Sequence, residues 1–180
     1  TDYVVRVKVC VSGGDFTVGD PADDSGCRQY PNGSYKPTGL LHEYGESDAM
    51  MFGLISGSYQ KNVDGGVLRK AMGSFRNEVN ASTGQFLNTD PGIIKTLNGL
   101  KTVGFGGSYE YSQSGDNCGW ITNGPLTTGR CRMWGNPVGE MMYEALRYYA
   151  GKGSATAAFA INATGNPDAT LGLSRATWDN

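Results

Sequence analysis

The sequence has 180 residues, of which 38% are hydrophobic, 18% are charged and 28 are glycine. This composition is typical of one soluble, loop-rich globular domain, and the glycines lack the three-residue period of a collagen-like fibre. A net charge of −2, with 15 basic and 17 acidic residues spread along the chain, offers no surface for nucleic acid. No apolar run approaches the roughly 20 residues that span a bilayer, so membrane insertion is not expected.

The four cysteines fall into two couples that are close in sequence: Cys10 with Cys27, and Cys118 with Cys131. Their loop-like surroundings favour two disulfides over four free thiols. Three connectivities are formally open, and pairing neighbours closes the shortest loops, each worth about 3 kcal/mol in chain entropy. A zinc site is disfavoured because there is no CxxC motif and the single histidine, His42, is remote. Disulfides in turn imply an extracytoplasmic location.

The N-terminal part of the chain predicts a strand followed by a long loop. Alternating valines over residues 3–11 predict a half-buried strand. Residues 12–35 predict a polar loop that the first disulfide would hold. Aspartates at positions 15, 20, 23 and 24 suggest calcium ligands, but the spacing of an EF-hand is absent. A solvated, turn-rich loop is therefore the preferred interpretation.

The middle of the chain predicts a helix over residues 37–44, an apolar strand over 50–59 and a strand over 65–72. His42 lies on the first helix without a GxSxG elbow, a reactive cysteine or the second histidine of a HExxH zinc helix. A catalytic role for His42 is therefore not expected. Residues 91–103 predict another helix, with apolar residues at helical spacing and Asp90 placed to cap it.

Residues 104–132 are irregular, rich in glycine and aromatic, with Tyr109, Tyr111 and Trp120. Exposed aromatic side chains carry much of the energy of protein interfaces, so these three are candidate binding residues. The alternative is that they pack beneath a disulfide-stapled loop.

The clearest helix signal covers residues 136–153. Asn136 is placed to cap the helix, Pro137 suits its first turn and Gly151 suits its end. Apolar residues at helical spacing predict one buried face; they are Val138, Met141, Met142, Ala145, Leu146 and Tyr149. Glu144 and Arg147 lie one turn apart on the other side and predict a solvent-exposed ion pair.

The same helix carries the main catalytic alternative. Glu140 and Glu144 are one turn apart, and their repulsion would raise the pKa of one carboxyl, as a general acid requires. Together they suggest a secreted, carboxylate-dependent hydrolase. A solvated helix face explains them equally well.

Taken together, an ordered set of segments resembles one family. The segments are VVRVKVCV, CRQYPNGSYKPTGLLHEYG, MMFGLISGSYQKNVDGGVLRKAMGSF, ASTGQF, GIIKTLNGL, CGWI, GRCRMWGNPVGEMMYEALRYYAGKGS and LGLSRATWDN. They resemble the PilY-type proteins, tip-associated adhesins and biogenesis factors of bacterial type IV pili, over nearly the whole chain. In that family a carboxy-terminal β-propeller follows this region, so the chain is expected to be an excerpt of a larger protein.

The resemblance implies an α/β fold, a partial von Willebrand factor A-like domain, as one segment over residues 1–180 with loop-rich embellishments at 11–35 and 104–132. It also places Asn136 where such domains carry a metal-ligating Thr before Pro. An amide oxygen can coordinate Mg²⁺ or Ca²⁺. The Asp-x-Ser-x-Ser strand end that supplies most of such a site does not occur in these residues, so no cofactor is expected to be required.

The resemblance further implies a non-enzymatic adhesion or assembly module at the cell surface or pilus tip of a bacterium. Its expected partners are other pilus or surface-assembly chains, or a second copy of itself, because an incomplete sheet exposes edges that invite pairing. A purely structural unit of the pilus-tip protein is a further alternative.

Overall fold

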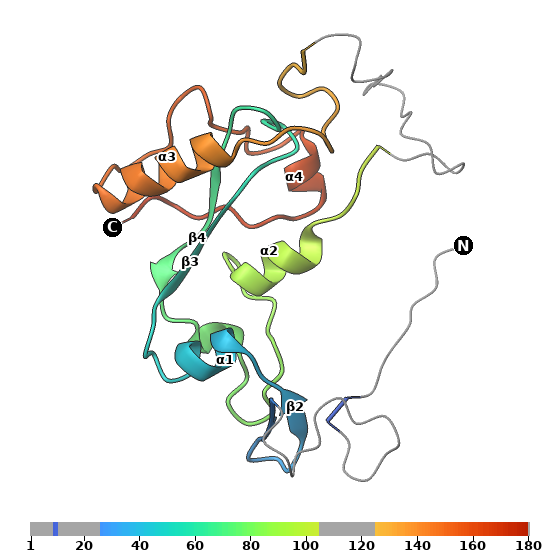
Figure 1. The fold of residues 1–180 in the computed structure, drawn as a ribbon, viewed down its shortest axis with the longest axis vertical. Helices are drawn as coiled ribbons and strands as arrows, with labels where there is room; N and C mark the ends of the chain where they lie inside the picture. Colours follow the sequence, from blue (N-terminus) through green and yellow to red (C-terminus); the bar gives the residue numbers. More distant parts are fainter. Residues whose placement is uncertain (1–8, 11–25, 105–124, 180) are drawn as a thin grey trace. The chain divides into compact units, whose positions relative to one another are not determined.

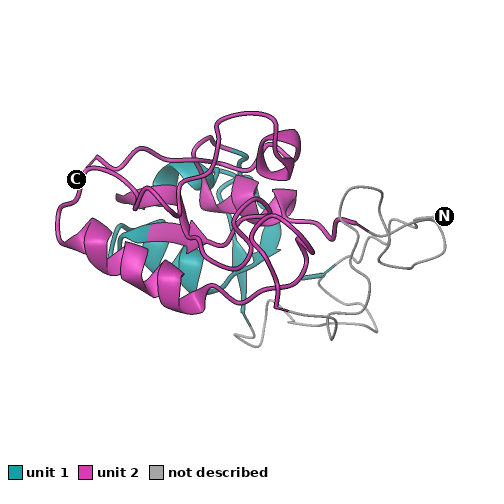
Figure 2. Ribbon diagram, turned by 90° about the horizontal axis from the view of Figure 1, so that it is seen from above, with its two compact units in different colours: residues 1–52, 73–88 teal, residues 53–72, 89–180 magenta. Residues whose placement is uncertain are grey.

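The computed structural model describes residues 9–10, 26–104 and 125–179 (Figure 1). Strand β1 spans Cys27–Gln29, β2 Tyr35–Pro37, β3 Phe52–Ser56 and β4 Val67–Gly73; helix α1 spans Leu40–Gly45, the 3₁₀ helix η1 Arg76–Glu78, α2 Ile93–Gly99, α3 Val138–Tyr149 and α4 Pro167–Thr170. The chain forms two compact units (Figure 2): residues 1–52 with 73–88, and residues 53–72 with 89–180. The expected mixture of strands and helices is confirmed for the described residues.

The first unit contains a short hairpin where the sequence predicts only loop. Strands β1 and β2 pair antiparallel, with Cys27 opposite Pro37. Their turn is closed by the Asn32 side chain, which accepts a hydrogen bond from the Ser34 backbone N–H at 3.0 Å. The loop prediction for residues 12–35 is therefore wrong at 27–29 and at 35. Strands of three residues are too short to show a period-two pattern, which is why the sequence does not reveal them.

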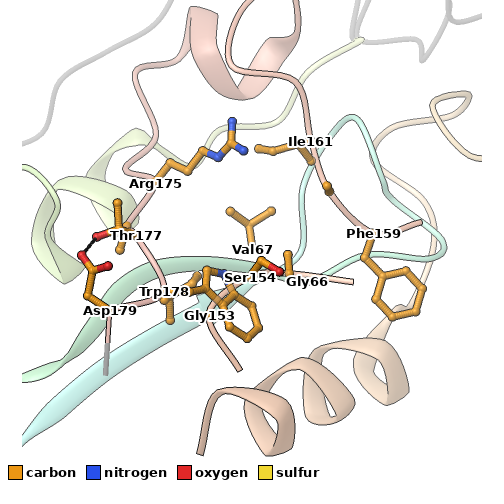
Figure 3. Close-up of a pocket in the computed structure, with 14 residues that line it drawn as sticks. Gly66, Val67, Gly153, Ser154, Phe159, Ile161, Arg175, Thr177, Trp178 and Asp179 are labelled. Atoms are coloured by element: carbon orange, nitrogen blue, oxygen red, sulfur yellow. Dashed lines mark hydrogen bonds between the residues drawn. The ribbon is translucent and has the colours of Figure 1, made fainter. Parts of the chain in front are cut away.

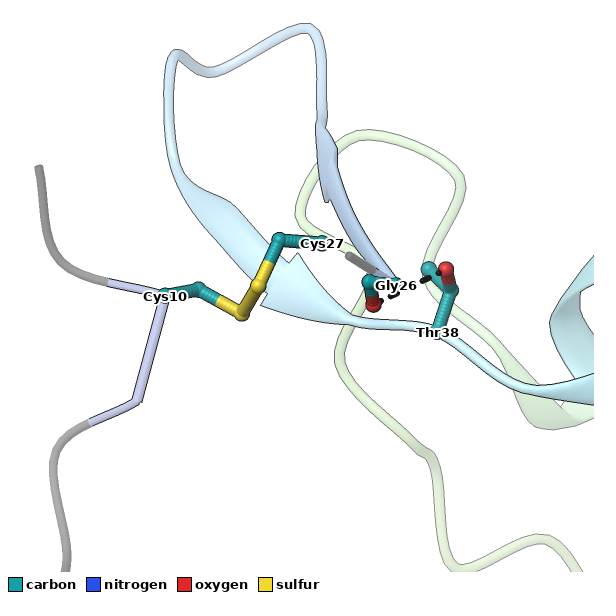
Figure 4. Close-up of a disulfide and its surroundings, with 4 residues drawn as sticks. All are labelled: Cys10, Gly26, Cys27 and Thr38. Carbon is teal, nitrogen blue, oxygen red and sulfur yellow. Dashed lines mark hydrogen bonds between the residues drawn. A yellow bond between two sulfur atoms is a disulfide. The ribbon is translucent and has the colours of Figure 1, made fainter. Parts of the chain in front are cut away.

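The Cys10–Cys27 disulfide is present, so this predicted pairing is confirmed (Figure 4). It joins residue 10 to the first residue of β1. Beside it, the Thr38 backbone N–H donates to the Gly26 carbonyl oxygen at 2.7 Å. The disulfide thus fastens Cys10 to the hairpin. Residues 3–8 and 11 of the predicted strand, and the aspartates proposed as calcium ligands, lie outside the described residues. At residues 9–10 the strand prediction is wrong, since Cys10 adopts φ +58°.

A polar cluster and an aromatic cluster hold the first unit together. Arg28 and the Tyr30 hydroxyl both donate to the Glu46 carboxylate, the latter at 2.6 Å. Gly84 packs against the buried Tyr30 ring at φ +67°, and a Cβ there would lie 2.2 Å from a ring carbon, so only glycine fits. The aromatic cluster centres on the buried Phe75 ring, which meets the rings of Phe52 and Phe86 edge-on.

The second unit is built on the two-stranded sheet of β3 and β4. Leu68 from β4, Tyr148 from α3 and Ala176 from the carboxy-terminal segment form its core, with partly buried Ile55, Ala71 and Trp178 packed against it. Helix α3 thus packs on the sheet through Tyr148 (Figure 1). The strands and helices of this unit lie within one to four residues of the predicted bounds, except for α4, which no periodic pattern announces.

Helix α2 differs from the sequence prediction in its N-cap and in which of its apolar residues are buried. Its N-cap is Gly92, and Asp90 does not cap it. Asp90 lies two residues before the N-cap, and its carboxylate instead accepts a hydrogen bond at 2.5 Å from Lys95 in the first turn of the helix. Of the apolar residues at helical spacing, Ile93 and Ile94 are buried, whereas Leu97 and Leu100 are exposed.

A buried ion pair joins four segments of the second unit. Arg69 on β4 donates to the Asp168 carboxylate on α4 at 2.6 Å, and both side chains are almost fully buried. The rest of the guanidinium donates to the Ser56 hydroxyl and to the backbone oxygens of Gly57 and Ser174. The other Asp168 oxygen accepts from the Tyr59 and Gln60 backbone N–H groups. A buried pair is tolerated only when its hydrogen bonds are satisfied in this way.

Replacing Arg69 with methionine should lower the free energy of unfolding by about 3–5 kcal/mol, because Asp168 is then left buried without its cation. The measurement is urea unfolding of the 180-residue chain. The double variant Arg69→Met/Asp168→Asn should recover part of that loss, since it removes the unpaired charge. A single variant that unfolds like the parent would show that the pair does not hold these segments.

A second prediction concerns His42, which is buried in the first unit and stacks on Phe86 with ring centroids 4.5 Å apart. Burial lowers the pKa of His42 below its ordinary value of 6.5, although the nearby Glu46 carboxylate opposes this shift. The unfolded chain therefore binds this proton more tightly than the folded chain does. Stability is complete above about pH 6.5 and falls as the pH drops below it.

The measurement is thermal unfolding between about pH 7.5 and pH 5 for the parent and for His42→Gln, which removes the titrating group. The parent should lose more stability than the variant over this interval. Parallel pH profiles for the two proteins would contradict the assignment.

Candidate interaction surface on helix α3

Helix α3 ends as predicted but begins differently. Gly151 adopts φ +73° after the helix, and its N–H donates to the Tyr148 carbonyl oxygen at 3.0 Å. At the other end Pro137 is the N-cap residue, and no side chain caps the helix. The capping prediction for Asn136 is therefore wrong, because the helix starts one residue too late for that side chain to reach its free N–H groups.

The entry to α3 is positioned by Asn62, a buried residue that the sequence analysis does not single out. Its side-chain amide donates to three backbone oxygens, those of Arg130, Cys131 and Trp134, at 2.7–3.2 Å. Its amide oxygen accepts from the Gly129 N–H at 2.8 Å. One asparagine thus satisfies four backbone groups of the loop before α3. Nothing in the local pattern of the sequence marks such a long-range role.

The inward face of α3 carries a buried carboxylate. Glu144 is completely buried, and its oxygens accept from the Thr156 backbone N–H at 3.0 Å and the Thr156 hydroxyl at 2.5 Å. Arg147 lies 3.3 Å from the same carboxylate. The predicted pairing of Glu144 with Arg147 is confirmed, but its placement in solvent is wrong. Both Glu144 oxygens are engaged in holding the loop after α3, which is a structural arrangement.

The other inward residue is Tyr148, which is buried. Its hydroxyl accepts a hydrogen bond from the Met72 backbone N–H at 3.0 Å, and its ring meets that of Trp178 with centroids 5.9 Å apart. Partly buried Met141 and Ala145 belong to this side of the helix as well. Of the six residues predicted to form a buried face, only these two are turned inward to any extent.

The outward face of α3 is apolar. Relative exposures are 49% for Val138, 68% for Met142, 67% for Leu146 and 69% for Tyr149. The prediction that these four residues are buried is wrong. At 3.6 residues per turn they fall within about a quarter of the helix circumference, while Glu140, Glu144 and Arg147 lie on the opposite side. The helix thus turns its charged side toward the protein and its apolar side outward.

This inversion makes the outward face of α3, defined by Val138, Met142, Leu146 and Tyr149, a candidate interaction surface. Single exposed apolar residues are common, but a contiguous row of large ones marks a surface that another molecule covers. The row bears no charge, so it suits an apolar partner. Tyr143, half exposed, adjoins it.

The other predicted site residues lie elsewhere. Asn136 is exposed just before α3, and within residues 9–10, 26–104 and 125–179 no three His, Cys, Asp or Glu side chains are grouped to hold a metal ion. A metal-ligating role for Asn136 stays a prediction. Tyr109, Tyr111, Trp120 and Cys118 lie outside the described residues, whereas Cys131 is disulfide-bonded.

In the part of the chain that the structure describes, no helix has the length and apolar character needed to span a membrane.

Two substitutions on α3 test which side faces inward. Leu146→Gln should change the free energy of unfolding by no more than about 0.5 kcal/mol, because the side chain is already in water. Tyr148→Ala should lower it by about 3 kcal/mol or more, because a buried ring and a hydrogen bond are lost. Urea unfolding measures both. The reverse ranking would show that the apolar row packs on the sheet.

Comparison with known proteins identifies relatives of the chain. Residues 52–180 match the family model described as PilY1 homolog, second domain. A type IV pilus biogenesis factor PilY1 homolog from Xylella fastidiosa is 44% identical over 187 residues, a match that covers 99% of this chain. The chain spans only 12% of that relative's length. No solved structure matches the chain.

Proposed function

The chain belongs to the family of PilY1 homologues, and on that basis we propose that it is a non-enzymatic assembly or adhesion module of a type IV pilus-associated protein. The curated relative is named as a pilus biogenesis factor, which supports a pilus-related role. The module acts by binding another chain. The proposed location is the outside of a bacterial cell, and the Cys10–Cys27 disulfide supports it, since such bonds persist in oxidising compartments.

The observation that carries this proposal is the outward face of α3. This face binds an apolar, uncharged helix face of another pilus-associated chain. Helix α3 has 12 residues and is therefore about 18 Å long, enough for an apolar row to pack into the grooves of one facing helix. A charged partner surface would lose its hydration against this row without gaining an opposite charge.

A lipid surface fits this face less well. Helices that lie on membranes combine an apolar face with basic residues at its borders. Arg147, the basic residue of α3, is instead bound to Glu144 and to the Ser154 carbonyl oxygen. The proposal therefore favours a protein partner.

The arrangement of α3 supports the two alternative functions, a hydrolase and a purely structural unit, less well. A hydrolase that uses Glu140 and Glu144 needs a carboxyl group free to exchange protons with a substrate, whereas both Glu144 oxygens are bound to Thr156. A purely structural unit needs no exposed apolar row. The von Willebrand factor A-like relationship and the aromatic residues Tyr109, Tyr111 and Trp120 stay predictions beside this proposal.

The test introduces Met142→Glu and Leu146→Glu together into the full-length protein in a piliated bacterium that carries it. Two charges on the outward face should weaken binding of the partner about 30-fold or more, which corresponds to the loss of about 2 kcal/mol of interface energy. The number of pili on the cell surface should fall as a result. Sheared pili are quantified by immunoblot, after export and abundance of the variant are checked.

The matched control is Lys152→Glu, which also lowers the net charge by two but changes an exposed residue beyond the end of α3. It should leave piliation unchanged. Normal piliation with the double variant would sink the assembly role of this face. Concentration-dependent dimerisation of the parent chain alone, abolished by the double variant, would instead assign the face to a second copy, and binding to vesicles would assign it to a membrane.

A further inference from the structure

A hollow of about 620 Å³ lies beside the start of β4 (Figure 3). Its floor is formed by the first residues of β4, and its walls by residues 153–161 and by the carboxy-terminal residues 175–179. Val67, Ile161 and Trp178 contribute apolar surface. Arg175 and Asp179 are the two charged residues in the lining. The hollow does not include the outward face of α3.

Buried polar groups hold the carboxy-terminal wall of the hollow. Arg69 donates to the Ser174 carbonyl oxygen at 3.2 Å, directly before Arg175. The Ala176 N–H donates to the Leu68 carbonyl oxygen on β4 at 2.9 Å. The Trp178 ring rests against Tyr148. This wall is therefore held in place by contacts with buried residues of the second unit.

The opposite wall is held from α3. The Glu144 carboxylate binds Thr156 through both its backbone N–H and its hydroxyl. Arg147 donates to the Ser154 carbonyl oxygen at 3.0 Å. Because both walls are fastened by buried or partly buried charges, the hollow is formed before any ligand arrives, as binding sites commonly are.

Arg175 is a charged residue of the hollow for which the described residues offer no partner. Its side chain extends across the hollow toward Ile161 and above Val67 (Figure 3). Within the described part of the chain, no hydrogen bond or ion pair joins its guanidinium to another residue. Asp179 forms no ion pair with it in the described part of the chain; the Asp179 carboxylate instead accepts a hydrogen bond from the Thr177 hydroxyl (Figure 3). A planar guanidinium in this setting matches a carboxylate, which it can bind through two parallel hydrogen bonds.

We propose that the hollow binds an extended peptide segment that presents a carboxylate next to an aliphatic side chain. The carboxylate pairs with Arg175, and the aliphatic group contacts Val67 and Ile161. A phosphate group fits less well, because phosphate sites gather several donors whereas this lining offers one cation and also contains the Asp179 carboxylate. This proposal rests on residues other than those of the α3 face, so its test is independent of the function proposed for that face.

The carboxylate has two sources, an acidic side chain or the carboxy terminus of the partner, and three probes distinguish them. They are acetyl-Leu-Glu-Leu-amide, acetyl-Leu-Gln-Leu-amide, and acetyl-Leu-Gln-Leu with a free carboxy terminus. Binding to the 180-residue chain is followed by NMR through the amide signals of Ile161, Ala176 and Trp178. The Glu peptide, the free-carboxylate peptide or both should bind about tenfold or more tightly than the uncharged one, because a hydrogen-bonded ion pair is gained.

Arg175→Gln should abolish that preference, and Arg175→Lys should retain part of it, because lysine keeps the charge but not the planar fork. Arg175 is exposed, so neither change threatens folding, which thermal unfolding verifies. The matched control is Arg130→Gln, which removes the same charge from an exposed residue outside the hollow. Equal binding of all three peptides, no binding of either carboxylate peptide, or signal changes confined to other residues would overturn the proposal.

Discussion

The buried ion pair between Arg69 and Asp168 is the interaction on which the second unit depends. It ties strand β4 to helix α4, and through Ser56, Gly57 and Ser174 it also fixes the end of β3 and the carboxy-terminal segment. Neither charge can be buried without the other, so the four segments must come together as a set. The described residues of this unit form a two-stranded sheet and a small apolar core, and a polar network of this kind replaces much of the packing that a larger sheet would supply.

The need of a buried charge for hydrogen-bonding partners also explains the orientation of α3. Glu144 is held inward by its hydrogen bonds with Thr156, and the apolar side of the helix is left facing out. A charged interior with an apolar exterior is the reverse of what a free-standing domain favours. It is intelligible in a module whose surface is covered in an assembly, where the interior of the interface is apolar. The chain belongs to the family of PilY1 homologues and spans 12% of the length of the relative from Xylella fastidiosa.

The two proposed surfaces differ in chemistry, although Glu144 and Arg147 hold both of them in position. The outward face of α3 offers shape and apolar area without charge, so it selects a partner by packing. The hollow beside β4 offers one guanidinium next to the aliphatic side chains of Val67 and Ile161, which is the basis for the proposed carboxylate ligand. Glu144 and Arg147 hold one wall of the hollow and also turn α3, which means that the two surfaces share a scaffold without sharing contacts.

The sequence by itself determined the family, the disulfide between Cys10 and Cys27, the approximate bounds of α1, α2 and α3, and the end of α3 at Gly151. These follow from local patterns: apolar periodicity, the short spacing of two cysteines, and a glycine able to adopt a positive φ. Only the tertiary structure decided which side of α3 is buried and that Asp90 and Asn136 do not cap their helices. The reason is that a periodic pattern locates an apolar row but does not reveal whether the charges opposite it find buried partners. The partner of Glu144, Thr156, is 12 residues away, and Asp168, the partner of Arg69 on β4, is 99 residues away.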